Sequence, residues 1–66
     1  MKNSLKVQRA IKNITQADLA EAIGVSRQTI NAMEKGKYVP STVLALKLAQ
    51  YFNQPVEAIF QLNDND

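Results

Sequence analysis

Residues 15–36 read TQADLAEAIGVSRQTINAMEKG, and this stretch decides how the rest of the chain is interpreted. Thr15 is a favourable N-cap residue, so a helix is predicted to begin directly after it. Gly24 readily adopts the left-handed conformation that ends a helix, and Ser26 offers another N-cap only two residues later. The stretch therefore predicts two short helices separated by a sharp turn, over residues 16–23 and 27–35.

The residues inside these two segments fit helices that cross at close range. Asp18 stands three residues after Thr15, the spacing of a capping box with Asp in place of the usual Glu or Gln. Ala20 is small enough to let the second helix approach, and a larger residue there would push that helix away. Together these features predict a helix-turn-helix, with apolar side chains that fill the space between its helices: Leu19, Ile23, Val25, Ile30 and Met33.

The outward face of the second of these helices is polar and contains no acidic residue. A helical wheel over residues 27–35 turns Ile30 and Met33 inward and leaves Glu34 at the flank. Arg can bind guanine, and Gln and Asn can each pair with adenine, so these residue types suit the major groove of DNA. An ordinary solvated helix face is the alternative, but such a face usually mixes Glu with Lys. The residues on the outward face are Arg27, Gln28, Asn31, Ala32 and Lys35.

The remaining segments are also predicted to be helical, which gives an all-α fold of five helices in one domain over residues 1–66. A first helix is expected over residues 5–12, with Leu5, Ile11 and Ile14 turned inward. Ser41 is expected to cap a helix over residues 42–52 that ends at Asn53, and Pro55 to open a short helix over residues 56–60. The residues after Phe60 are also candidates to pair as a short strand with residues 2–4.

Composition excludes several classes of function. The 66 residues include no Cys, no His and no Trp, so the usual ligands of zinc, haem and iron–sulfur clusters and the usual catalytic nucleophile and base are missing. We therefore expect a protein that is not an enzyme and needs no cofactor or metal. No apolar run is long enough for a membrane span or a signal peptide, so a cytoplasmic protein without a membrane partner is expected.

The charge is weakly positive and unevenly distributed. Eight Lys and Arg against six Asp and Glu give +2. Two of the acids are Asp64 and Asp66, so residues 1–62 carry eight basic against four acidic side chains, or +4. This excess is a weak footprint for binding a polyanion, and an ordinary positive excess of a soluble domain explains it equally well.

On these residues the chain resembles the Cro/C1-type, or Xre, family of phage-type helix-turn-helix repressors, most closely its compact stand-alone members. The resemblance spans residues 5–60, a lambda-repressor-like DNA-binding domain, with the helix-turn-helix core at about residues 16–35. The segments that carry it are Thr15 to Ala20, Gly24 to Ile30, Glu34-Lys35-Gly36, Pro40-Ser41 and Leu46 to Ala49. Their joint spacing is far more specific than a lone capping box.

The resemblance implies a role for each matching position. Ser26, Arg27 and Gln28 match the first turn of the recognition helix, where bases are read, and Asn31 and Ala32 lie one turn further on, next to bases or backbone. The positions expected to contact DNA phosphates are Gln16, Lys35, Lys37 and Tyr38. Arg9 and Glu34 match a family ion pair between the first and third helices, and we prefer this structural role for Arg9 over a phosphate contact.

The helix over residues 42–52 has more apolar surface than one core contact requires. Its wheel places Ala45, Leu46, Ala49 and Phe52 on the side that matches the family core, and a second stripe about 120° away. That stripe either packs against the last helix or forms a homodimer interface, and we expect the interface. The residues expected in it are Leu44, Leu48, Tyr51, Val56, Ile59 and Phe60.

Dimerisation would place two recognition helices about 34 Å apart, in successive major grooves of a near-palindromic site. The expected function is a sequence-specific DNA-binding transcriptional regulator, a repressor whose partners are double-stranded DNA and a second copy of the chain. An antitoxin with the same fold, whose main partner is a toxin or another regulatory protein, is the alternative. A protein-binding adaptor is a third reading, which the acid-free face disfavours.

Overall fold

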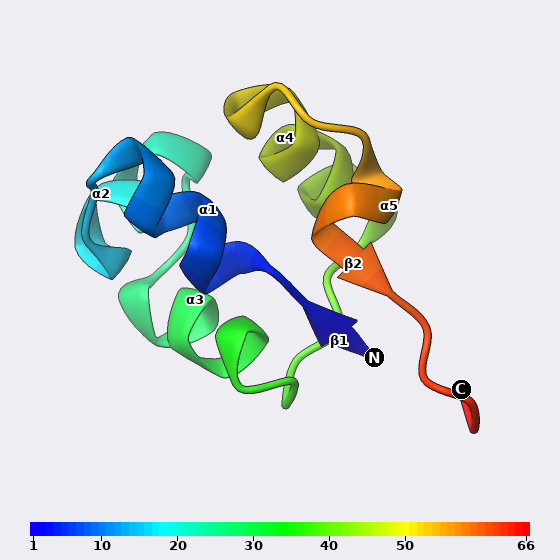
Figure 1. Ribbon diagram of the computed structural model, residues 1–66. Helices are drawn as coiled ribbons and strands as arrows, with labels where there is room; N and C mark the ends of the chain where they lie inside the picture. Colours follow the sequence, from blue (N-terminus) through cyan, green and yellow to red (C-terminus); the bar gives the residue numbers. More distant parts are fainter.

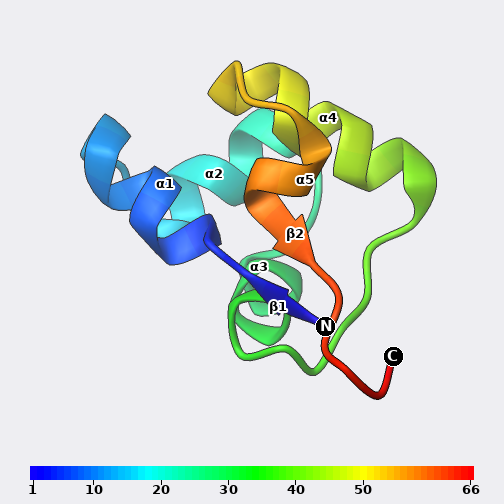
Figure 2. The ribbon, with the colours of Figure 1, turned by 45° about the vertical axis from the view of Figure 1, so that its right-hand side comes forward.

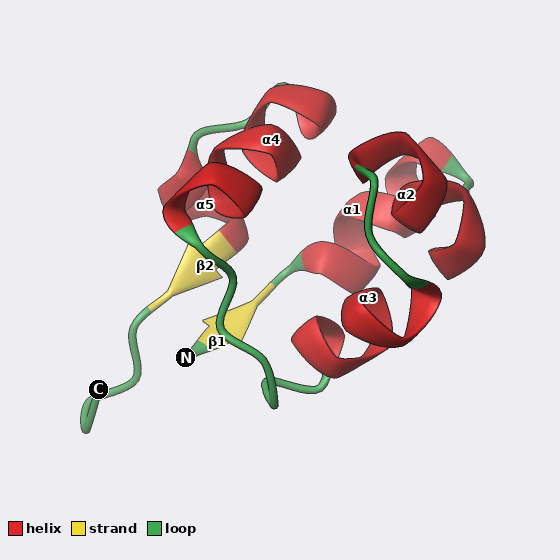
Figure 3. Ribbon diagram, turned by 180° about the vertical axis from the view of Figure 1, so that it is seen from behind, coloured by secondary structure: helices red, strands yellow, loops and turns green.

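Five helices and a two-stranded sheet make up the computed structural model, which describes all residues from Met1 to Asp66. In chain order they are β1 (Lys2–Asn3), α1 (Leu5–Lys12), α2 (Gln16–Ile23), α3 (Arg27–Glu34), α4 (Thr42–Phe52), α5 (Val56–Ile59) and β2 (Phe60–Gln61). Helices α1, α2 and α3 form one group and α4 and α5 another (Figure 1). Viewed from behind, the two groups lie on either side of a shared interior, with the strands at one end (Figure 3).

The helix boundaries follow from local capping interactions. The Thr15 hydroxyl accepts from the Asp18 N–H at 3.0 Å while the Asp18 carboxylate accepts from the Thr15 N–H, which completes the predicted capping box. The hydroxyls of Ser26 and Ser41 accept from the N–H groups of Thr29 and Leu44 and so cap α3 and α4. Gly24 ends α2 at φ 85°, in the left-handed region that glycine adopts without steric cost. The starts of α2, α3 and α4 and the end of α2 agree with the predicted ones, whereas α3 ends at Glu34 and not at residue 35, and α5 ends at Ile59 because Phe60 begins β2.

The core lies between the two groups of helices and joins every helix of the chain. Helix α2 packs against both α3 and α4, so it is the central element of the fold. Twelve buried residues form one hydrophobic cluster, so the chain has a single core. They are Leu5, Leu19, Ala20, Ile23, Ile30, Met33, Leu44, Leu48, Ala49, Phe52, Ile59 and Phe60.

The short sheet brings the two ends of the chain together. Strands β1 and β2 are antiparallel, with Lys2 opposite Gln61 and Asn3 opposite Phe60. The N-terminal ammonium lies 3.1 Å from the Asp66 carboxylate, and both termini lie at the same end of the molecule (Figure 2). The strands suggested by the sequence therefore form, although β2 begins at Phe60 rather than after it.

Two predicted core positions are wrong. Ile11 was expected inside but is 73% exposed, and Leu46 was expected in the core of α4 but is 56% exposed. In α1 the inner face carries Leu5 and Arg9, and Ile11 lies on the opposite side of the wheel. A pattern of apolar residues cannot reveal a face on which a charged side chain is turned inward.

The predicted dimer stripe also needs correction, because most of it is buried within the single chain. Leu44 is 8% and Leu48 0% exposed, and Ile59 and Phe60 belong to the same core. Helix α4 packs against both α2 and α5, which bury most of the two apolar stripes without a second copy and leave Leu46 exposed. Of the six positions expected at the interface, only Tyr51 and Val56 are partly exposed.

Candidate nucleic-acid interface

The inner side of helix α3 packs against the hydrophobic core. Ile30 and Met33, on its inner side, are almost completely buried, and Val25 in the preceding turn packs against the same core. The opposite side of α3 faces solvent, with Arg27 and Gln28 exposed and Asn31 and Ala32 half-buried. Sequence and packing therefore agree on which face of α3 is available to a partner.

The exposed side chains surround a shallow polar hollow. Its volume is about 270 Å³, and no hydrophobic residue lines it. Three of the lining residues come from α3 and the fourth from the start of α2, so the hollow spans both helices of the helix-turn-helix. It is lined by Gln16, Arg27, Gln28 and Asn31.

Some polar groups in the first turn of α3 form hydrogen bonds with one another. The Ser26 hydroxyl accepts from the Thr29 N–H at 3.1 Å and shares a 2.9 Å hydrogen bond with the Thr29 hydroxyl. Ser26 remains exposed, but its oxygen is engaged as the helix cap. The pairing with Thr29 was not anticipated, although a hydroxyl residue three positions after an N-cap serine is a signal that could have indicated it.

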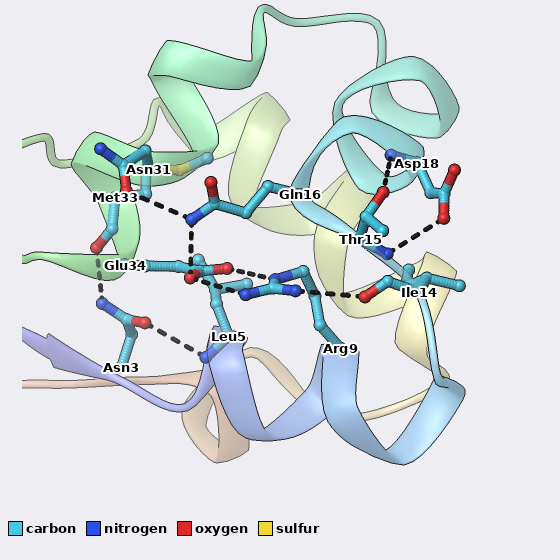
Figure 4. A network of polar contacts seen from close by, with 10 residues as sticks. All are labelled: Asn3, Leu5, Arg9, Ile14, Thr15, Gln16, Asp18, Asn31, Met33 and Glu34. Atoms are coloured by element: carbon cyan, nitrogen blue, oxygen red, sulfur yellow. Dashed lines mark hydrogen bonds and ion pairs between the residues drawn. The ribbon is translucent and has the colours of Figure 1, made fainter.

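Arg9 and Glu34 form a bidentate ion pair beneath this face (Figure 4). Nε of Arg9 lies 2.5 Å from Oε2 of Glu34, and Nη2 of Arg9 lies 3.0 Å from Oε1. Nη1 donates to the Ile14 carbonyl at 3.1 Å, so every nitrogen of this guanidinium has a partner within the chain. The pair is mostly buried, with side-chain exposures of 15% and 7%. Arg9 therefore ties α1 to α3, and three of its five N–H donors are used within the chain.

The ion pair fixes the charge state of both groups. The hydrogen bond to Glu34 raises the pKa of Arg9 above its ordinary value. Burial alone would raise the pKa of Glu34, but hydrogen bonds from Arg9 and Gln16 outweigh burial and hold that pKa below the ordinary value. Glu34 is thus a carboxylate turned inward and neutralised, which leaves the outward face of α3 without a free negative charge.

The positions expected to contact phosphates fall into two groups. Lys35, Lys37 and Tyr38 lie exposed at the end of α3 and in the loop after it, where Gly36 turns the chain at φ 73°. Gln16 instead points toward α3, where its amide nitrogen lies 3.2 Å from Oδ1 of Asn31 and 3.1 Å from Oε1 of Glu34. The three loop residues are available to an anion, whereas the Gln16 side chain is already engaged.

Asn3 is a supporting residue that the sequence analysis missed. Its Nδ2 donates to the Met33 carbonyl at 2.7 Å, and its Oδ1 accepts from the Leu5 N–H at 3.1 Å. It therefore holds the last turn of α3 against the start of α1 (Figure 4). An Asn just before a helix is a known capping signal, but nothing in the sequence shows that it also reaches α3.

A helix-turn-helix family model matches residues 5–59, which is most of the chain. The chain belongs to the Cro/C1-type helix-turn-helix family. The match begins at the first residue of α1 and ends at the last residue of α5, so the family domain comprises all five helices.

Several small relatives match this helix-turn-helix protein along its whole length. An uncharacterized HTH-type transcriptional regulator of Methanocaldococcus jannaschii is 56% identical over 66 residues, covering 100% of both chains. One of Bacillus subtilis is 46% identical over 100% of both chains, and one of Archaeoglobus fulgidus is 46% identical over 100% of this chain and 93% of its own.

The family assigns a general function to this helix-turn-helix protein, which is a DNA-binding transcription regulator and not an enzyme. None of its helices combines the length and the apolar character that crossing a membrane requires.

Proposed function

We propose that this protein is a repressor that binds a near-palindromic operator as a homodimer, and that α3 reads the bases. The main support for the proposal is the exposed polar face of α3, which carries no acidic side chain. Residues of this face and the start of α2 line one polar hollow. A major groove about 12 Å wide admits one α-helix, and α3 is the helix whose polar side is free. A repressor of this size acts by occupying promoter DNA.

The side chains on this face divide into base readers and phosphate binders. Arg27 is suited to guanine O6 and N7, and Gln28 to the N6 and N7 edge of adenine. Ser26 and Asn31 offer further polar contacts, and the Ala32 methyl suits the thymine methyl. The groups that would bind phosphate are the exposed Lys35, Lys37 and Tyr38, which add affinity for any sequence.

A second copy must dock on a surface other than the buried stripe, and one apolar groove meets that requirement. It has a volume of about 250 Å³ and lies between the start of α4, α5 with β2, and the N-terminus. Beside and within it are exposed apolar side chains, including Val39 at 67% and Leu46 at 56% exposed. The lining residues are Met1, Val39, Pro40, Thr42, Ala45, Leu46, Val56 and Phe60.

A second copy suits this groove because a two-fold interface must be self-complementary. The same patch carries a hollow and, next to it, projecting apolar side chains that can fill the hollow of the partner. Val39 follows directly after the loop that carries Lys37 and Tyr38, so an interface here would fix the two α3 helices relative to each other. Of the residues that the sequence predicts at the interface, Val56 and Phe60 line this groove.

Selection of bound fragments from random DNA, followed by footprinting, tests this proposal. We expect a motif of two inverted half-sites with centres one helical turn, about 34 Å, apart, and lower output from a reporter promoter that contains it. Binding without sequence preference, or a single unpaired half-site, would contradict the proposal. Specific binding only together with a co-expressed protein would favour the antitoxin alternative.

A further inference from the structure

The Gln16 side chain has no donor left for DNA. A glutamine amide carries two N–H groups, and its oxygen only accepts. Here Nε2 donates to Oδ1 of Asn31 at 3.2 Å and to Oε1 of Glu34 at 3.1 Å, so both N–H groups are used within the chain. A phosphate offers acceptors only, and the remaining Gln16 oxygen cannot bond to it.

The same bonds determine how Asn31 faces the hollow. Its Oδ1 is turned toward Gln16, and its amide nitrogen points away from Gln16 (Figure 4). Glu34 anchors Gln16 from below, and Arg9 in turn holds Glu34. The orientation of a side chain on the outward face therefore depends, through two residues, on an ion pair beneath that face.

We propose that Gln16 is a positioning residue that orients the Asn31 amide, so that Asn31 presents its N–H groups to acceptor atoms of a base. Guanine O6 and N7, thymine O4 and adenine N7 are acceptors of this kind in the major groove. Gln16 thereby acts on sequence preference through Asn31 and not on affinity through phosphate. The inference rests on the proposed base reading by α3.

A double-mutant cycle on DNA separates positioning from a phosphate contact. Gln16→Ala, Asn31→Ala and the double variant are compared with the wild type on the selected operator and on non-specific DNA of equal length. We expect Gln16→Ala to weaken operator binding roughly 2- to 10-fold, the range of one hydrogen bond, without weakening non-specific binding. We also expect the double variant to bind the operator no more weakly than Asn31→Ala alone, because the two residues act as one unit.

Gln16→Ala also changes the first residue of α2, so a matched control is needed for any loss of helix stability. Asp18→Asn disturbs the capping box at the same helix end but touches neither Asn31 nor Glu34. This variant should keep the operator preference of the wild type. Equal losses from Gln16→Ala on both DNAs, additive losses in the double variant, or the same loss of preference in Asp18→Asn would each overturn the positioning role.

A measurement without DNA distinguishes failure of this inference from failure of the proposed function. In NMR spectra of the free protein, the side-chain NH₂ resonances of Asn31 should shift and broaden in Gln16→Ala and stay unchanged in Asp18→Asn. Unchanged Asn31 resonances in Gln16→Ala would overturn the inference even if operator binding holds. A wild type without sequence preference would overturn the proposed base reading instead.

Discussion

Glu34 illustrates how one residue can matter to the proposed binding face of α3 without lying on that face. It is the only acid within α3, and the fold turns its carboxylate inward, where Arg9 and Gln16 bind it. Exposed on the outer side of α3, this carboxylate would repel DNA phosphates. The inward position therefore serves both the packing of α1 on α3 and the charge of the binding face.

Glu34→Gln should destabilise the protein by about 3 kcal/mol at pH 7, because it leaves Arg9 as an uncompensated, mostly buried charge. The lowered pKa of Glu34 means that its contribution is present above the unfolded-state pKa and is lost as pH falls through the folded-state pKa. Urea unfolding of both proteins over a pH series measures this effect. The difference in unfolding free energy between the wild type and Glu34→Gln should shrink as pH falls well below about 4.3. A difference that stays constant over the pH series would contradict this role of the Glu34 carboxylate.

Lys37→Ala should weaken binding to every DNA sequence by a similar factor, because Lys37 is an exposed cation in the loop after α3. The dependence of log affinity on log salt concentration should lose about one unit of slope, as expected when one phosphate contact is removed. Fluorescence anisotropy over a salt series provides the measurement. Lys47→Ala, which removes an exposed cation from α4, is the matched control and should leave the slope unchanged.

At the scale of single residues, the sequence correctly predicted which polar side chains are exposed, and their roles toward DNA stay predictions. Arg27, Gln28 and Lys37 are exposed polar groups, as their chemistry indicated. The hydrogen bonds of Gln16 could not be predicted, because they depend on how α2 and α3 cross. A side chain expected to face DNA was instead found to face its own chain.

At the scale of elements, caps define helix boundaries and packing defines helix orientation. Thr15, Ser26 and Ser41 act within three residues of themselves, so local sequence was enough to place the starts of α2, α3 and α4. Which side of α1 or α4 faces inward depends on neighbours distant in sequence. The errors at Ile11 and Leu46 are both of this second kind.

Ser26 and Ser41 allow the cap of the recognition helix to be tested against an equivalent cap elsewhere. Each hydroxyl accepts from the backbone N–H three residues later at 3.1 Å. Ser26→Ala and Ser41→Ala should each cost about 1 kcal/mol of stability in urea unfolding. Only Ser26→Ala should also weaken operator binding, so equal effects of the two variants on DNA would contradict the role given to the first turn of α3.

At the scale of the whole molecule, the two chain ends and the apolar groove lie together. The β1–β2 sheet and the ion pair between Met1 and Asp66 hold the termini at the end of the molecule where Met1 lines the groove. The sequence predicted a homodimer but assigned it to residues that the core already uses. Two apolar stripes on α4 could equally cover two neighbours in one chain, and the structure shows that α2 and α5 are those neighbours.

Leu46→Glu should separate the proposed dimer, because it introduces a charge into the groove without disturbing the core. We expect the dimer dissociation constant in sedimentation equilibrium to rise at least about tenfold, and operator affinity to fall with it. Ile11→Glu is the matched control, since Ile11 is exposed on α1 and does not line the groove. A dimer that resists Leu46→Glu, or dissociates equally in Ile11→Glu, would contradict the proposed interface.

Base reading by α3 is the central claim, and Gln28→Ala tests it most directly. Affinities of the wild type and Gln28→Ala are measured on the selected operator and on operators with single-base changes at every position. The account predicts a loss of about 1 to 3 kcal/mol on the operator, with relaxed preference at one position of each half-site. An equal loss on the operator, on all single-base variants and on random DNA would contradict it.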